Sequence, residues 1–196
     1  MRPQDVLVLL KLVVLEVALP REATGLDLLG AEQGNANHLR ALHAVQPWKQ
    51  LDLARELGLS QTEISDSLNR NRLAGLVDSE KRRPMRRALT EFLLHGLRYV
   101  FPIEPGRVVR GMPTAHSAPP LSKVVVSEDK YVWPDEVGEL RGEAIEPLYP
   151  TVPHAARRDA RLYELLALTD AIRVGRAREQ KLAREELERR LLEARP

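Results

Sequence analysis

Proline is concentrated in the middle of this chain, and no other feature constrains the fold as much. Nine of the 14 prolines among its 196 residues lie between positions 102 and 153. Because proline lacks a backbone N–H and fixes its φ angle, regular helix and central strand are both unfavourable across this span. We therefore expect mostly irregular chain here, with short extended pieces at 107–110 and 123–127. Trp133 and Tyr131 should anchor it on the rest of the molecule.

Helical patterns flank this span on both sides. Aromatic residues make up only 4% of the chain, and Leu and Ala supply the apolar volume, which favours helix over strand. The spacing of apolar residues predicts helices at 4–18, at 84–99 and from 155 onward, with a break at Gly175. The C-terminal helices carry two apolar sides, one with Leu162, Leu165, Leu166, Leu168 and Ile172, the other with Leu182, Leu187, Leu191 and Leu192. The predicted fold class is mainly α with an irregular middle.

The segment at 49–75 has the pattern of two short helices joined by a tight turn. Leu53 and Ala54 precede Leu57 by four and three positions, which predicts the inner side of the first helix. Gly58 follows at the point where a left-handed residue ends a helix without strain.

The second helix is predicted to begin at Ser60. Ser60 and Glu63 have the Ser-x-x-Glu spacing of a capping box, and Gly75 is placed to end the helix. A helix, a short turn with glycine and a second, capped helix make up the helix-turn-helix motif that binds DNA. The side chains expected to point inward are Ile64, Leu68 and Leu73.

The outward positions of the second helix carry side chains that match base edges. Gln and Asn can bind adenine through two hydrogen bonds, Arg can do so with guanine, and a Thr methyl can contact a thymine methyl. We expect the N-terminal part of this helix to enter the major groove. The alternative is a helical hairpin whose polar residues only face water. The outward positions are Gln61, Thr62, Ser65, Asp66, Asn69 and Arg70, with Arg72 nearer the DNA backbone.

A basic stretch follows this segment directly. The formal net charge is only +2, so the placement of charges has to decide whether nucleic acid is a partner. Acidic residues oppose the stretch only at Glu91 and Glu104. We expect its first part, at 81–87, to contact phosphates. The stretch consists of Lys81, Arg82, Arg83, Arg86, Arg87, Arg98, Arg107 and Arg110.

Residues 48–77, and especially LARELGLSQTEISDSLNRNRLAGLV, resemble the helix-turn-helix of bacterial winged-helix regulators of the broad MarR type. The resemblance covers about thirty residues and implies a helix, a turn, a recognition helix and a first wing strand. One departure concerns the wing, for which only residues 76–83 are available before Pro84. We therefore expect a short or missing wing, with a basic loop at 81–87 in its place.

Two functional hypotheses follow. The first is a sequence-specific transcription regulator that binds double-stranded DNA as a homodimer, with two recognition helices about one turn of DNA apart. Residues 1–100 would form the DNA-binding domain, 101–154 would pack on its core, and 155–196 would supply the dimer contact.

The second hypothesis rests on a weaker resemblance. The segments FLLHGLRYVFP, RGMPTAHSAPPL and VWPDEVGELRGEAIEPLYP resemble parts of helix-turn-helix partners in toxin–antitoxin or phage-defence pairs. An antitoxin-like protein of this kind would bind a partner through 102–196 and autoregulate through the helix-turn-helix.

Other classes of function find no support in the sequence. The chain has no Cys, and its five His residues lack the spacing of metal ligands, so we expect no metal, no cofactor and no enzymatic activity. The apolar run at 6–19 is shorter than a membrane span and contains Lys11 and Glu16. It also lacks the basic start of a signal peptide. We expect a buried helix there and a cytoplasmic protein without membrane contact.

Overall fold

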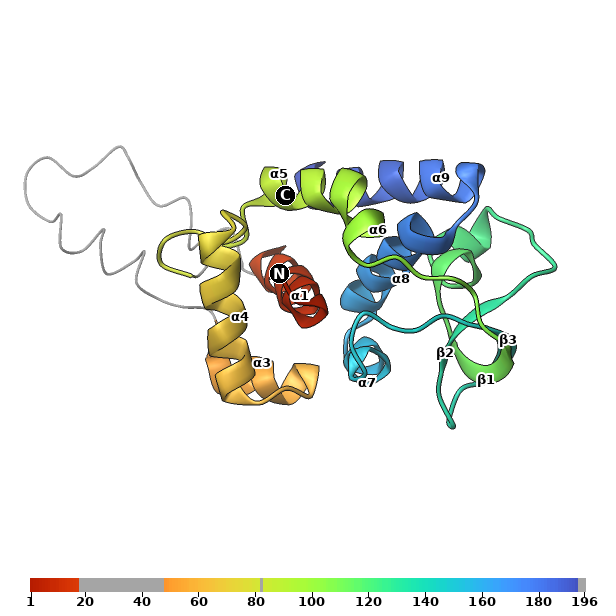
Figure 1. Cartoon of the computed structure of the whole chain (residues 1–196), viewed down its shortest axis with the longest axis horizontal. Coiled ribbons are helices and arrows are strands. Elements are labelled where there is room, and N and C mark those ends of the chain that lie inside the picture. Colours follow the sequence, from red (N-terminus) through yellow and green to blue (C-terminus); the bar gives the residue numbers. More distant parts are fainter. Residues whose placement is uncertain (18–47, 82, 194–196) are drawn as a thin grey trace, which may run out of the picture.

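A computed structural model describes residues 1–17, 48–81 and 83–193. The chain is mainly helical, with a small three-stranded sheet at one end (Figure 1). Residue 18, the last of the helix predicted at 4–18, lies outside the described residues. The helices are α1 (Pro3–Val17), α3 (Gln50–Leu57), α4 (Gln61–Leu73), α5 (Arg86–Glu91), α6 (Leu97–Val100), α7 (Val152–Arg158), α8 (Ala160–Val174) and α9 (Ala177–Glu188).

Helix α1 lies at the centre of the molecule, between the α3–α4 pair and α8 (Figure 1). Its residues from Val6 to Leu10 are completely buried, as expected for a helix that is apolar on all sides. The prediction of a buried helix at 4–18 is confirmed. No helix in the described parts combines the length and the apolar character needed to cross a bilayer.

The helical run predicted at 84–99 is present as α5 and α6, which a π-helical turn at Phe92–Gly96 joins. Leu89, Leu93 and Leu97 are fully buried on one side of this run. Pro84 precedes the run and belongs to a short hairpin described below.

The middle of the chain contains a sheet of β1 (Val108–Pro113), β2 (Tyr131–Pro134) and β3 (Leu140–Ala144). Strand β1 pairs antiparallel with both others, and β2 pairs parallel with β3, so the sheet closes on itself. The expectation of a mostly irregular middle is therefore wrong in part. The predicted piece at 107–110 falls largely in β1, but 123–127 contains no strand.

The prolines do not prevent this sheet because they stand at strand ends. Pro113 and Pro134 are the last residues of β1 and β2, where proline is tolerated. Gly111 lies so close to β2 that a Cβ would clash with the carbonyl of Trp133. Trp133 itself is buried, as its predicted anchoring role requires.

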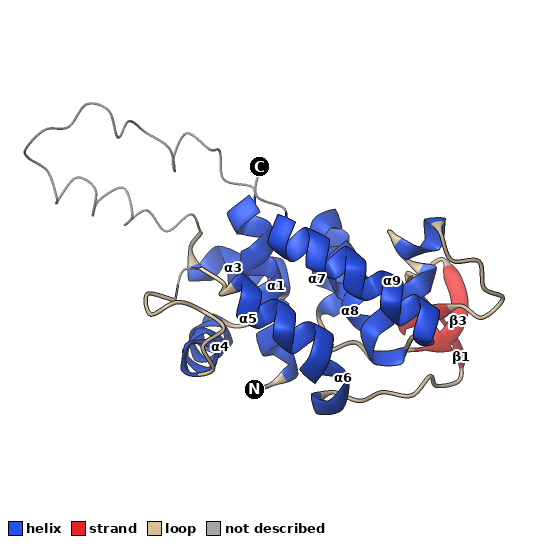
Figure 2. Cartoon of the chain, turned by 90° about the horizontal axis from the view of Figure 1, so that it is seen from above, coloured by secondary structure: helices blue, strands red, loops and turns tan. Residues whose placement is uncertain are grey.

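The C-terminal helices α8 and α9 meet at Gly175, as predicted, and α9 lies across α8 toward α5 (Figures 1 and 2). Asp170 of α8 is buried and accepts hydrogen bonds from Thr114 Oγ1 (2.9 Å) and Trp133 Nε1 (2.6 Å). It also forms an ion pair with Arg173 (2.6 Å). This network ties α8 to the sheet region.

The two apolar sides predicted for dimerisation face the chain's own core. Leu187 and Leu191 are fully buried, and so are the leucines on the inner side of α8. Helix α9 covers one side of the core that α1, α5 and α8 share. On the α9 side Leu182 is half-buried and Leu192 is exposed, and the homodimer stays a prediction.

Candidate nucleic-acid interface

Helices α3 and α4 form a pair joined by residues 58–60. Leu53, Ala54 and Leu57 are buried on the inner side of α3, as predicted. Gly58 has φ +65°, and its N–H donates to the carbonyl of Ala54, so it ends α3 in the predicted left-handed conformation. A Cβ at Gly58 would lie 3.2 Å from the side chain of Thr151, because the chain before α7 packs against this turn.

The predicted capping box at the start of α4 is present. The N–H of Ser60 donates to Glu63 Oε2 (2.8 Å), and the N–H of Glu63 donates to Ser60 Oγ (3.2 Å). The hydroxyl of Tyr149 donates to the other oxygen of Glu63 (2.9 Å). Hydrogen bonds from Ser60 and Tyr149 lower the pKa of Glu63, and the bond to Glu63 raises the pKa of Tyr149. The Tyr149 contact joins residues far apart in the chain, and no local sequence pattern predicts it.

The inner side of α4 differs from the prediction at one position. Ile64 and Leu68 are buried, but Leu73 is 77% exposed. Leu73 follows Ile64 by nine positions, which at ~100° per residue places it on the opposite side of the helix. Asn71 is buried in its place and donates from Nδ2 to the carbonyl of Asp5 (3.3 Å) and to Ser67 Oγ (3.3 Å).

Arg70 faces α1 in this structure. Its Nε and Nη2 donate to the carboxylate of Asp5 at 3.0 Å and 2.7 Å, and the Asp5 side chain is completely buried. This hydrogen bonding raises the pKa of Arg70, so the guanidinium stays charged. The predicted contact of Arg70 with bases stays a prediction, but the structure adds a role the sequence did not suggest, in which Arg70 fixes α4 against α1.

The remaining predicted positions share one side of α4, which we call the outward side. It faces away from α1 at one end of the molecule (Figure 1). Gln61, Thr62, Asp66 and Arg72 are exposed there, and Ser65 and Asn69 are half-buried. The outward side consists of Gln61, Thr62, Ser65, Asp66, Asn69, Arg72 and Leu73.

The chain between α4 and α5 forms a short hairpin at 76–85. Val77 and Pro84 pair across it, and the N–H of Met85 donates to the carbonyl of Leu76 (2.9 Å). The short or missing wing stays a prediction, and the basic loop expected at 81–87 is shorter than expected because α5 begins at Arg86. Lys81 stands at its turn with φ +59°.

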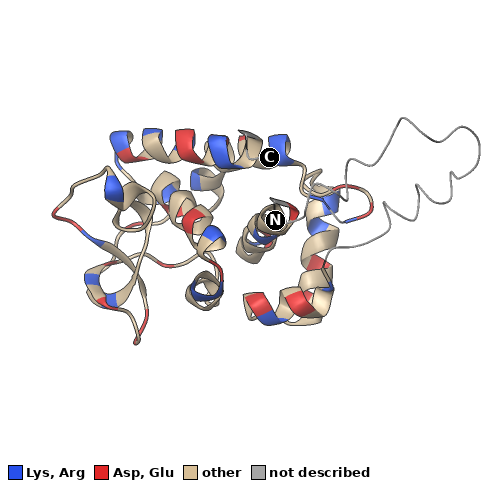
Figure 3. Ribbon diagram, turned by 180° about the vertical axis from the view of Figure 1, so that it is seen from behind, with Lys and Arg blue, Asp and Glu red and all other residues tan. Residues whose placement is uncertain are grey.

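The predicted cations at 81–87 fall into two groups. Arg83 and Arg87 are exposed, and Lys81 is half-buried, whereas Arg82 lies outside the described residues. Arg86 instead lies inward, where it donates to Glu16 of α1 (2.7 Å) and to the carbonyl of Leu191 (2.9 Å). In Figure 3, α4 carries red toward its start and blue toward the hairpin, which projects from its end.

The α3–α4 pair is tied to the rest of the molecule through a buried lysine. Lys11 Nζ lies 2.5 Å from Glu56 of α3 and 2.7 Å from Asp159, which caps α8. Burial alone would lower the pKa of Lys11, but the bonds to Asp159 and Glu56 outweigh burial and raise it. One side chain of α1 thus fixes both α3 and α8.

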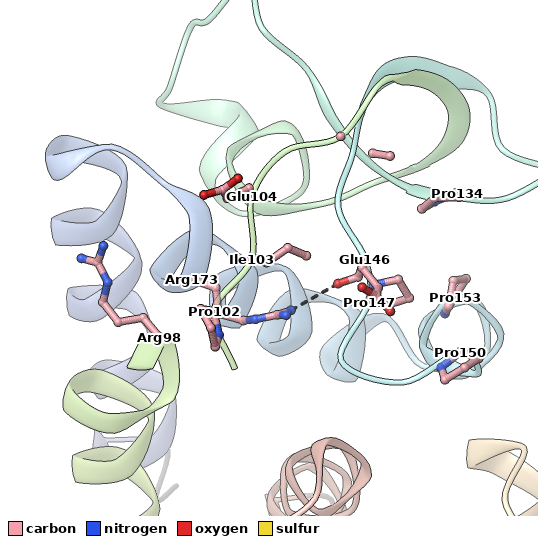
Figure 4. A pocket seen from close by; sticks show the side chains of 12 residues that line it. Arg98, Pro102, Ile103, Glu104, Pro134, Glu146, Pro147, Pro150, Pro153 and Arg173 are labelled. Carbon is pink, nitrogen blue, oxygen red and sulfur yellow. Dashed lines mark hydrogen bonds between the residues drawn. The ribbon is translucent and has the colours of Figure 1, made fainter. Parts of the chain in front are cut away.

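An open pocket of about 990 Å³ lies on a different part of the molecule, between the chain after α6, the end of the sheet and α8 (Figure 4). Five prolines line it together with Ile103. Arg173 lies at its floor and donates to the carbonyl of Glu146 (3.4 Å). Glu104 and Arg98 also line it.

Within the residues that the structure describes, no three His, Cys, Asp or Glu side chains are placed to hold a metal ion. The chain matches no known protein family model, no curated protein and no solved structure. The functional proposal therefore rests on the arrangement of α3, α4 and the hairpin.

Proposed function

We propose that this chain is a sequence-specific DNA-binding transcription regulator of the bacterial cytoplasm that reads the major groove with the outward side of α4. One observation carries the proposal. A capped helix at the end of the molecule exposes a row of mostly uncharged hydrogen-bonding groups, next to a hairpin that bears cations. Base edges and phosphates are the partners that such a pair of surfaces complements.

In this proposal α3 and α4 act as a helix-turn-helix. The N-terminus of α4 carries partial positive charge and enters the groove, where Gln61, Ser65 and Asn69 face the bases. The hairpin acts as a short wing, and Arg83, Arg87 and Lys81 contact phosphates on its side of the groove. A homodimer would place two copies of α4 on half-sites one helical turn apart.

The alternative, a helical hairpin that only faces water, accounts less well for the composition of the outward side. Solvated helix faces gain from pairs of opposite charge spaced three or four apart. On the outward side only Asp66 and Arg72 are charged, and in the described part of the chain neither forms an ion pair.

A salt titration of the full chain with fluorescent duplex DNA tests the proposal. Phosphate contacts make the logarithm of the association constant fall linearly with the logarithm of salt concentration, by about 0.9 per contact. We expect Arg83→Ala and Arg87→Ala each to reduce this slope by about that amount. Arg178→Ala, which removes an exposed cation of α9, should leave the slope unchanged. Absence of duplex binding at low salt would overturn the proposal.

The proline-lined pocket favours a second candidate, an antitoxin-like or defence-associated protein that binds a protein partner through 102–196 and autoregulates through α4. Proline-rich surfaces lose little conformational entropy when they bind. In this case a protein encoded nearby copurifies with the chain, and Ile103→Arg in the pocket abolishes that interaction while DNA binding persists. Copurification that survives Ile103→Arg would reject the pocket as the contact.

A further inference from the structure

The contact between Arg70 and Asp5 changes which bases the outward side of α4 can recognise, if α4 reads DNA as proposed above. Arginine is the side chain that most often reads guanine, through two hydrogen bonds to O6 and N7. The guanidinium of Arg70 already donates to a fully buried carboxylate through Nε and Nη2. Reaching a base would leave the charge of Asp5 buried without its partner, which is costly. Arg70, the side chain of α4 best suited to bind guanine, is therefore not available to contact bases.

The groups that remain on the outward side favour A·T base pairs. Gln61 and Asn69 can each make the two hydrogen bonds that select adenine N6 and N7. Thr62 carries a methyl group that can contact the thymine methyl, and Ser65 can bond to either base pair.

The two charged residues of the outward side do not reverse this preference. Arg72 lies in the last turn of α4, and in helix-turn-helix proteins the N-terminal residues of the second helix contact the bases. Arg72 is thus placed toward the DNA backbone. Asp66 precedes Arg70 by one turn, and its charge helps to raise the pKa of Arg70. On the outward side Asp66 is a single carboxylate that could accept from cytosine N4, against the two amides of Gln61 and Asn69 that select adenine.

We propose that this protein selects major-groove sites whose central base pairs are A·T, with Gln61 and Asn69 reading adenine and with Thr62 against a thymine methyl. Asp5 is the positioning residue of this selectivity, because it holds the one guanine-reading side chain away from the groove.

Selection of bound duplexes from a random pool, followed by sequencing, tests this inference with the full chain. The expected result is an enriched core of A·T pairs. An enriched core of G·C pairs, or duplex binding without any base preference, would overturn the inference and leave DNA binding standing. If no duplex is retained, the proposed function fails, and the inference fails with it.

Two variants sharpen the test. Asn69→Ala, at a half-buried surface position, should lose about tenfold in preference for adenine at one position of the core, the size of a single two-bond contact. Asp5→Asn should release Arg70 and shift one position of the core toward guanine. Lys181→Ala on α9 is the control and should reproduce the core of the unaltered chain. Equal selectivity of Asn69→Ala and the control would refute the assignment even if Asp5→Asn does not fold.

Discussion

Helices α4 and α9 are similar in sequence pattern and differ in what they expose. Both are amphipathic, and in both the N–H of the N-cap residue donates to a Glu three positions on, from Ser60 to Glu63 in α4 and from Arg176 to Glu179 (2.9 Å) in α9. The side chain of Ser60 also accepts a bond in return, which the guanidinium of Arg176 cannot do. The exposed side of α9 carries charges that pair with one another, such as Lys181 with Glu185 (4.0 Å) and Arg189 with Glu186 (2.7 Å). Blue and red bands alternate along α9 in Figure 3.

A solvated helix and a candidate recognition helix differ in whether their exposed charges have partners on the same helix. Lys181 on α9 and Arg189 in the turn after it each have a carboxylate of α9 three or four positions away, a spacing that is typical of a solvated helix. In the part of the chain that the structure describes, the outward side of α4 has no such pairs, and Arg70, on another side of the same helix, donates to the buried carboxylate of Asp5 in α1.

The largest effect is expected for Leu187→Ala on the buried side of α9. Leu187 is completely buried, so its truncation should lower the free energy of unfolding by about 2–5 kcal/mol. Urea unfolding measures this loss. The dimer interpretation of α9 would instead predict a lower association constant between copies with little change in the stability of each copy.

Arg70→Met should cost less, about 2 kcal/mol, because it leaves the buried Asp5 carboxylate with only the N–H of Arg2 as a partner. Arg72→Met is the matched control, since it makes the same change on the exposed side of the same helix. It should change the free energy of unfolding by less than about 0.5 kcal/mol. Equal effects of the two substitutions would mean that α4 does not depend on α1 for its position.

Acid should weaken the connection between the α3–α4 pair and α8. Burial alone would raise the pKa of Asp159, but hydrogen bonds from Lys11 and from the N–H groups of Leu162 and Arg161 outweigh it and lower the pKa. A lowered pKa stabilises the fold above the ordinary value of 3.8, and this stabilisation is lost as pH falls through the lowered pKa.

Unfolding in urea between about pH 5 and 2 measures this loss. Asp159→Asn keeps a side chain that can cap α8 but does not titrate, so its stability should fall less steeply with acid over the same range. Parallel curves for the two proteins would show that Asp159 does not contribute.

The smallest effect is expected for Lys181→Ala on the exposed side of α9. Its ion pair with Glu185 is exposed and long, so the free energy of unfolding should change by less than about 0.5 kcal/mol. DNA affinity should also be unchanged. A large loss in either quantity would remove the contrast between α9 and α4.

The sequence was sufficient where local chemistry decides the structure. The capping box of Ser60 and Glu63, the left-handed Gly58 and the break at Gly175 each follow from a few neighbouring residues, and all are present. Leu73 shows where apolar character alone misleads. An apolar residue at the end of a helix is expected to point inward, but the helical angle places Leu73 opposite Ile64, on the exposed side.

Long-range partners were not predictable in the same way. Arg70 and Arg86 look like free cations in the sequence, yet their carboxylate partners stand 65 and 70 positions away on α1. The sheet likewise depends on the pairing and register of strands, which a single sequence does not reveal. The apolar sides of α8 and α9 could equally have packed against a second copy of the chain. These contacts depend on tertiary packing, which the sequence pattern does not fix.

Site-directed labelling compares the two exposed helix sides directly, because the chain contains no Cys. Thr62→Cys and Lys181→Cys each place a single thiol at an exposed position, on α4 and on α9 respectively. With saturating duplex DNA, we predict that maleimide labelling slows strongly at position 62 and stays unchanged at position 181. Equal labelling rates at position 62 with and without bound DNA would contradict the claim that α4 enters the groove.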